Sequence, residues 1–61
     1  MSLQDEMLRY RARERISQSE LAKRCGVSLQ TINSVENGVQ NPSRVTKQKI
    51  LFVVRQKEEQ R

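Results

Sequence analysis

Residues 17–38 read SQSELAKRCGVSLQTINSVENG, and they contain two short helical patterns separated by one glycine. The first pattern opens on Ser17 with Glu20 three residues later, the spacing of a capping box at a helix start. Gly26 follows the pattern, and a glycine at this place supplies the left-handed conformation that ends a helix. These signals predict a helix over about residues 18–25.

A second helix is predicted directly after this glycine. Ser28 is a good N-terminal cap, Ile32 and Val35 lie at the spacing of one inward face, and residues 36–38 (ENG) close the helix. Ala22 is small, as required where two such helices approach most closely. Two short helices joined by a glycine turn meet the requirements of a helix-turn-helix, and residues 17–38 are its predicted core.

Helical patterns also flank this segment. Apolar residues at helical spacing predict a first helix over about residues 3–14. The run Asn-Pro-Ser at 41–43 starts a fourth, capped by either the asparagine or the serine, that extends over about residues 44–58. The expected fold is therefore all-α, with four helices in one domain over residues 1–61.

Composition and charge exclude several classes of function. The 61 residues include 12 Lys and Arg against 7 Asp and Glu, and this net charge of +5 favours a polyanionic partner. With one cysteine and no histidine, a conventional zinc site, an intrachain disulfide and a nucleophile with a histidine base are excluded. We expect no metal, no cofactor and no enzymatic activity. Because Tyr10 and Phe52 are the only aromatic residues, base stacking on single strands is also excluded, which leaves the DNA duplex.

The chain shows no sign of a membrane or secreted protein. It has no run of about 18 apolar residues, and its first residues resemble neither a signal sequence nor a transit peptide. We therefore expect a cytoplasmic protein without a membrane partner. A small-molecule ligand is not expected, because we expect no second domain that could hold a pocket.

The segment 17–38, with Asn-Pro-Ser at 41–43 after it and MLRYR at 7–11 before it, resembles the Cro/repressor (XRE) helix-turn-helix family of lambdoid phages and bacteria. The resemblance covers about residues 7–54. It implies a lambda-repressor-like bundle whose third helix lies in the major groove while the second crosses the DNA backbone, usually as a two-fold dimer on a palindromic operator. The implied function is sequence-specific, double-stranded DNA binding by a transcriptional regulator, in the first place a repressor.

Three features depart from the family pattern. Arg15 stands where the family usually has a glycine, so the first turn must be built without one. Lys47 stands where the family usually has a buried leucine. The fifth helix common in the family is missing, and residues 55–61 (RQKEEQR) take its place.

The resemblance directs attention to the outer face and N-terminal half of the third helix, where base-reading side chains are expected. Gln30 is the first choice, because a glutamine can pair bidentately with adenine, and Leu29 can contact a thymine methyl or serve in packing. The full set of expected base contacts is Leu29, Gln30, Thr31, Asn33 and Ser34.

Residues beside the third helix are expected to hold the DNA backbone. Gln18 matches the family glutamine that binds a phosphate at the start of the second helix. Arg11 and Glu36 match family positions that pair with each other, which implies a structural ion pair between the first helix and the end of the third. The expected backbone contacts are Gln18, Ser28, Asn37, Gln40 and Arg44.

The fourth helix carries five consecutive apolar residues at 50–54 (ILFVV), which on a helix span about 400° and therefore do not fit on one face. A homodimer would cover the remainder, and Leu51, Phe52 and Val54 are the expected interface. Two alternatives are that the first helix or the N-terminal arm folds over this patch, or that residues 50–54 form a strand that pairs with its mate.

Two other functions remain open. The protein could be the DNA-binding antitoxin of a toxin–antitoxin pair, which a neighbouring toxin gene would indicate. It could also be an accessory factor for recombination or excision, which binding at an attachment site rather than at a promoter would indicate.

Overall fold

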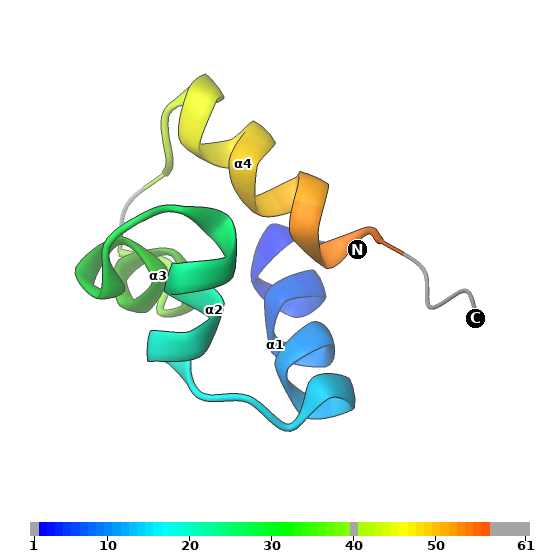
Figure 1. The fold of residues 1–61 in the computed structure, drawn as a ribbon. Coiled ribbons are helices and arrows are strands. Elements are labelled where there is room, and N and C mark those ends of the chain that lie inside the picture. The colour runs from blue at the N-terminus through cyan, green and yellow to red at the C-terminus, as the bar shows by residue number, and fades with distance from the viewer. Residues whose placement is uncertain (1, 40, 57–61) are drawn as a thin grey trace.

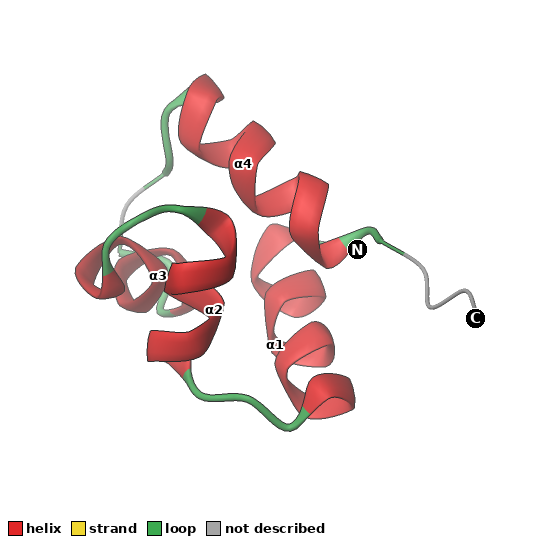
Figure 2. Ribbon diagram, viewed as in Figure 1, coloured by secondary structure: helices red, strands yellow, loops and turns green. Residues whose placement is uncertain are grey.

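The computed structural model describes residues 2–39 and 41–56, and this part of the chain forms four helices and no strand (Figures 1 and 2). The all-α, four-helix fold is thus confirmed. In Figure 1, α2 and α3 lie together on one side of the molecule, and α4 passes above α1. The helices are α1 (Leu3–Glu14), α2 (Gln18–Cys25), α3 (Leu29–Glu36) and α4 (Arg44–Val54).

Every helix begins in the same way. A serine in extended conformation precedes the first helical residue, and its Oγ accepts the backbone N–H three residues later, which satisfies one of the unpaired amides of the first turn. At the start of α4 the cap is therefore Ser43, not Asn41. The pairs and N···O distances are Ser2 with Asp5 (3.2 Å), Ser17 with Glu20 (3.2 Å), Ser28 with Thr31 (3.1 Å) and Ser43 with Thr46 (3.2 Å).

The first two helices also end alike, on a left-handed residue. At the end of α2 this residue is Gly26 (φ 73°, ψ 34°), and the next N–H, from Val27, bonds back to a carbonyl of α2 at 3.0 Å. At the end of α1 it is Arg15 (φ 57°, ψ 48°), and the N–H of Ile16 bonds back at 3.1 Å in the same pattern. The turn that lacks the family glycine is therefore built by an arginine in the glycine's conformation, which costs about 1–2 kcal/mol.

A small core lies where the four helices meet. Each helix contributes one wholly buried side chain, namely Met7, Leu21, Ile32 and Ile50. Cys25 lies in the same core, and burial raises the pKa of its thiol, so it is a packing residue. The other buried apolar side chains are Tyr10, Ala22, Val35, Val53 and Val54.

The fourth helix is shorter than the predicted 44–58. It ends at Val54, and Arg55 (φ −97°, ψ 3°) begins a turn. The apolar residues stop at this point, and the polar residues that follow offer no face that could pack and extend the helix. Residues 57–61 lie outside the described part of the chain.

This geometry corrects the expected dimer interface. The side chain of Val54 lies in the core and is only 8% exposed, because the last turn of α4 packs against α1. Phe52 is 72% exposed and Leu51 is partly buried.

Lys47 is exposed, so this position adds nothing to the core. In the described residues, no helix has both the length and the apolar character needed to cross a membrane.

Candidate nucleic-acid interface

Helix α3 has one buried side and one exposed side. Ile32 and Val35 hold the buried side against the core. Three of the predicted base contacts, Leu29, Gln30 and Asn33, are exposed, with Leu29 at 47%. The other two, Thr31 and Ser34, are partly buried, and the Thr31 hydroxyl bonds to the Ser28 hydroxyl at 2.8 Å.

The structure brings Arg11 and Glu36 together as a bidentate ion pair. Arg11 donates from Nε to Glu36 Oε2 and from one terminal nitrogen to Oε1, both at 2.9 Å. The Glu36 side chain is 3% exposed and that of Arg11 is 23% exposed. Because both carboxylate oxygens are bonded, the buried charge is neutralised, and α1 is tied to the last turn of α3.

Three predicted DNA-contacting residues form a hydrogen-bonded chain on this ion pair. Gln18 donates from Nε2 to Glu36 Oε1 at 2.9 Å. Asn33 donates from Nδ2 to Gln18 Oε1 at 3.3 Å, and Asn37 donates from Nδ2 to Asn33 Oδ1 at 2.8 Å. We call Gln18, Asn33 and Asn37 the amide chain, and it connects the start of α2 with the exposed side of α3.

Two residues that the sequence analysis missed support this cluster. Gln4 donates from Nε2 to the backbone carbonyl of Glu36 at 3.0 Å. Gly38 (φ 70°) lies so close that a Cβ there would stand 3.0 Å from Gln4 Nε2. The available signal was spacing, because Gln4 precedes Arg11 by seven residues and therefore lies on the same side of α1.

A family model described as helix-turn-helix, HTH_3, matches residues 7–51, well over half of the chain. The chain belongs to the XRE family of helix-turn-helix proteins. No curated protein and no solved structure matches it. The XRE domain is a DNA-binding regulatory domain, so α2 and α3 are its helix-turn-helix and the exposed side of α3 is its DNA-facing candidate.

The remaining predicted backbone contacts of this XRE domain lie around α3. Ser28 uses its Oγ to cap the helix. Arg44 is the first residue of α4 and is exposed. Gln40 lies outside the described residues.

The charges of the XRE domain are unevenly distributed along the chain. From residue 21 to residue 57 the only acidic residue is Glu36, whose carboxylate is occupied by Arg11 and Gln18. The same segment contains seven cations, which are Lys23, Arg24, Arg44, Lys47, Lys49, Arg55 and Lys57. The other carboxylate of the helix-turn-helix is that of Glu20 in α2, which accepts from Arg24 Nε at 3.3 Å. Both carboxylates of the helix-turn-helix are thus paired, and α4 contains none.

Two of these cations are engaged within the fold: Arg55 pairs with Glu6 of α1, and Arg24 bonds to side chains of α1 and α2. Arg24 donates to the Tyr10 hydroxyl at 3.0 Å, to Glu14 at 3.3 Å and to Glu20 at 3.3 Å. The hydrogen bond to Tyr10, followed by the one to Glu14, raises the pKa of Arg24. Arg24 therefore ties α2 to α1.

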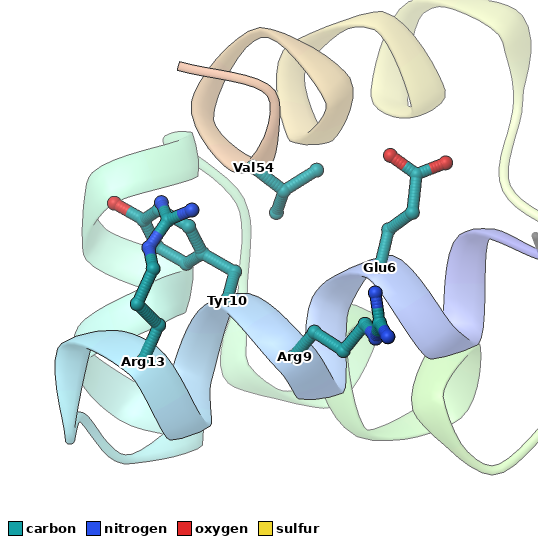
Figure 3. A pocket seen from close by; sticks show the side chains of 5 residues that line it. All are labelled: Glu6, Arg9, Tyr10, Arg13 and Val54. Atoms are coloured by element: carbon teal, nitrogen blue, oxygen red, sulfur yellow. The ribbon is translucent and has the colours of Figure 1, made fainter. Parts of the chain in front are cut away.

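A hollow of about 340 Å³ lies between α1 and the end of α4 (Figure 3). Four of its lining residues come from α1, and Val54 comes from α4. Within the described part of the chain, none of the predicted DNA-contacting residues lines it, and no cluster of His, Cys, Asp or Glu side chains is arranged to hold a metal ion. The lining residues are Glu6, Arg9, Tyr10, Arg13 and Val54.

Proposed function

We propose that this XRE protein is a sequence-specific regulator of transcription, a repressor that inserts α3 into the major groove of a palindromic operator. The observation that carries the proposal is the exposed side of α3. There Gln30 and Asn33 present amide groups, which hydrogen-bond to base edges, beside the half-exposed Leu29. Because the one carboxylate of α3, that of Glu36, is buried and paired, it repels the approaching polyanion little.

The phosphate contacts in this proposal come from the edges of the helix-turn-helix. Gln18 stands at the start of α2, where backbone N–H groups also point outward, and its Nε2 keeps a second hydrogen beyond the one given to Glu36. Ser28, Asn37, Gln40 and Arg44 would hold the backbone on either side of α3. Such contacts set position and strength without reading sequence.

We further propose that the protein binds as a homodimer through α4. Val45 and Phe52 are 65% and 72% exposed and lie seven residues apart, on one side of that helix. Leu51 adds partly buried apolar surface beside them. Exposed apolar side chains on one side of a helix suit an interface, and a two-fold dimer would place two α3 helices about 34 Å apart along one face of DNA.

The function is tested by selecting bound sequences from random duplex DNA. We expect a two-fold symmetric site, and affinity for it should fall by about 10³ between 50 and 200 mM salt if about six phosphates are contacted. Failure to enrich any sequence, or binding without a salt dependence, would contradict the proposal.

The dimer is tested by sedimentation equilibrium at micromolar concentration. The wild type should sediment as a dimer and Phe52→Lys as a folded monomer with weak operator binding, because the lysine places a charge in the apolar contact. Val39→Lys is the matched control, since Val39 is 73% exposed but lies outside α4. A monomeric wild type, or equal effects of the two lysines, would refute the interface.

A further inference from the structure

We infer that Asn33 reads an adenine and that the hydrogen-bond chain from Glu36 through Gln18 holds its amide in the orientation that does so. This inference rests on the proposed function, since it assumes that the exposed side of α3 meets base edges. It goes beyond the proposed function by naming the base that is recognised, the residue that recognises it, and the residues that position that side chain.

The donor-to-acceptor direction along the amide chain is set by the Glu36 carboxylate, whose oxygens act as acceptors. Both oxygens of the Glu36 carboxylate accept hydrogen bonds from Arg11, so Gln18 turns its Nε2, a donor, toward Oε1. The Oε1 of Gln18 then faces Asn33, which must present Nδ2, and the Oδ1 of Asn33 is left to accept from Asn37. Reversing the Asn33 amide would set two donors and two acceptors against each other.

The remaining hydrogen-bonding capacity of Asn33 matches adenine. A side-chain amide has two N–H donors and a carbonyl oxygen with two lone pairs. The amide chain uses one donor and one lone pair, and the exposed side chain keeps one of each. In the major groove adenine offers N7 as acceptor beside the N6 amino group as donor, which is the pair that an asparagine amide contacts bidentately.

Gln30 provides the contrast on the same helix. It is exposed, and its side chain makes no hydrogen bond to any residue that the structure describes, so nothing there selects one orientation of its amide. Gln30 can pair with more than one base by turning over. Asn33 cannot turn over without breaking both bonds of the amide chain.

The experiment begins with the site that the wild type selects from random duplex DNA. Affinities of the wild type and four variants are then measured for this site and for sites with single adenines replaced by other bases or by 7-deazaadenine, which lacks N7. For the wild type, one adenine in each half-site should be worth about 5- to 150-fold over another base. The variants are Asn33→Ala, Asn33→Asp, Gln18→Met and Gln30→Ala.

Each variant has a distinct expected result at that adenine. Asn33→Ala should bind adenine, 7-deazaadenine and the other bases equally, and Asn33→Asp, which only accepts, should prefer cytosine. Gln18→Met should weaken all sites by losing a phosphate donor and should also shrink the preference ratio, which loss of a phosphate contact alone does not change. Gln30→Ala, the matched control, should leave the ratio at this position unchanged.

The outcomes separate this inference from the proposed function. If the wild type selects no site, both are overturned. If it selects a site but Asn33→Ala keeps every preference, the reading role of Asn33 is refuted and the regulator stands. If Asn33→Ala abolishes the preference while Gln18→Met keeps the wild-type ratio, the positioning role of Gln18 is refuted.

Discussion

Among the ion pairs that join α1 to its neighbours, two arginine–glutamate pairs have nearly equal geometry and unequal surroundings. Toward α3, Arg11 meets Glu36 at 2.9 and 2.9 Å. Toward the end of α4, Arg55 meets Glu6 at 2.9 and 3.0 Å. The glutamate side chains are 3% exposed at Glu36 and 17% exposed at Glu6, and the arginine side chains are 23% exposed at Arg11 and 63% exposed at Arg55.

Equal distances therefore do not imply equal energies. Water screens the exposed Arg55 guanidinium, and the Glu6 carboxylate keeps partial access to water when Arg55 is removed, so this pair contributes less than the buried one. The carboxylate of Glu36 has no such alternative, because removing Arg11 would leave a buried charge with only the Gln18 amide as a side-chain partner. Comparing the two pairs tests whether burial, not contact geometry, decides how much an ion pair contributes to the free energy of unfolding.

The largest expected effect comes from breaking the buried pair. Arg11→Met keeps an apolar stem but orphans the Glu36 carboxylate, and it should lower the free energy of unfolding by about 3–5 kcal/mol. A domain of this size has only about 3–9 kcal/mol in total, so the variant should be largely unfolded or close to it. Urea denaturation followed by circular dichroism measures the loss.

The matched control, Arg55→Met, makes the same change at the exposed pair and should leave the urea midpoint nearly unchanged. Comparable losses in the two variants would break the comparison.

The next prediction distinguishes the stability that the ion pair itself contributes from the cost of leaving the Glu36 carboxylate unpaired. Arg11→Met combined with Glu36→Leu removes both charges, and it should recover most of the stability that Arg11→Met loses, because the penalty lies in the unpaired carboxylate. The same denaturation experiment measures the recovery. A double variant as unstable as the single one would show that the pair itself contributes most of the energy.

The smallest effect concerns pH at the exposed pair. The hydrogen bond from Arg55 lowers the pKa of Glu6 below its ordinary value of 4.5. Because the folded-state pKa is the lower one, the stabilisation is complete above about pH 4.5 and is lost as the pH falls through the folded-state pKa. The stability difference between wild type and Glu6→Gln, measured by denaturation from pH 3 to 7, should therefore shrink toward the acid end. A difference that stays constant with pH would rule out the charge of Glu6 as its source.

The helix-turn-helix was predictable from the sequence because its signals are local. Ser17 and Gly26 bound α2, Ser28 starts α3, and each signal acts within a few residues of the boundary that it sets. The partnership of Arg11 with Glu36 came from family resemblance, since nothing local connects residues 25 positions apart. The exposure of Gln30 and Asn33 followed from helical spacing.

The features that the sequence did not predict depend on side chains from different helices meeting. The amide chain needs α2 and α3 to be placed to within a fraction of an ångström, which residue patterns do not specify. The Arg55–Glu6 pair joins residues 49 positions apart, and the expected continuation of α4 to residue 58 drew attention away from it. The family pattern marked the turn at Arg15, but its left-handed conformation was not predicted, because an arginine itself carries no signal for positive φ.

The four serine caps have a consequence for how the chain folds. Each helix carries its start signal within four consecutive residues, so the helices can begin to form without waiting for distant contacts. Helix formation takes about a microsecond, and small helical proteins dominated by local contacts fold in roughly microseconds to milliseconds. Fast folding therefore shortens the time during which the apolar side chains that the fold buries at the end of α4, Ile50, Val53 and Val54, are exposed to other chains.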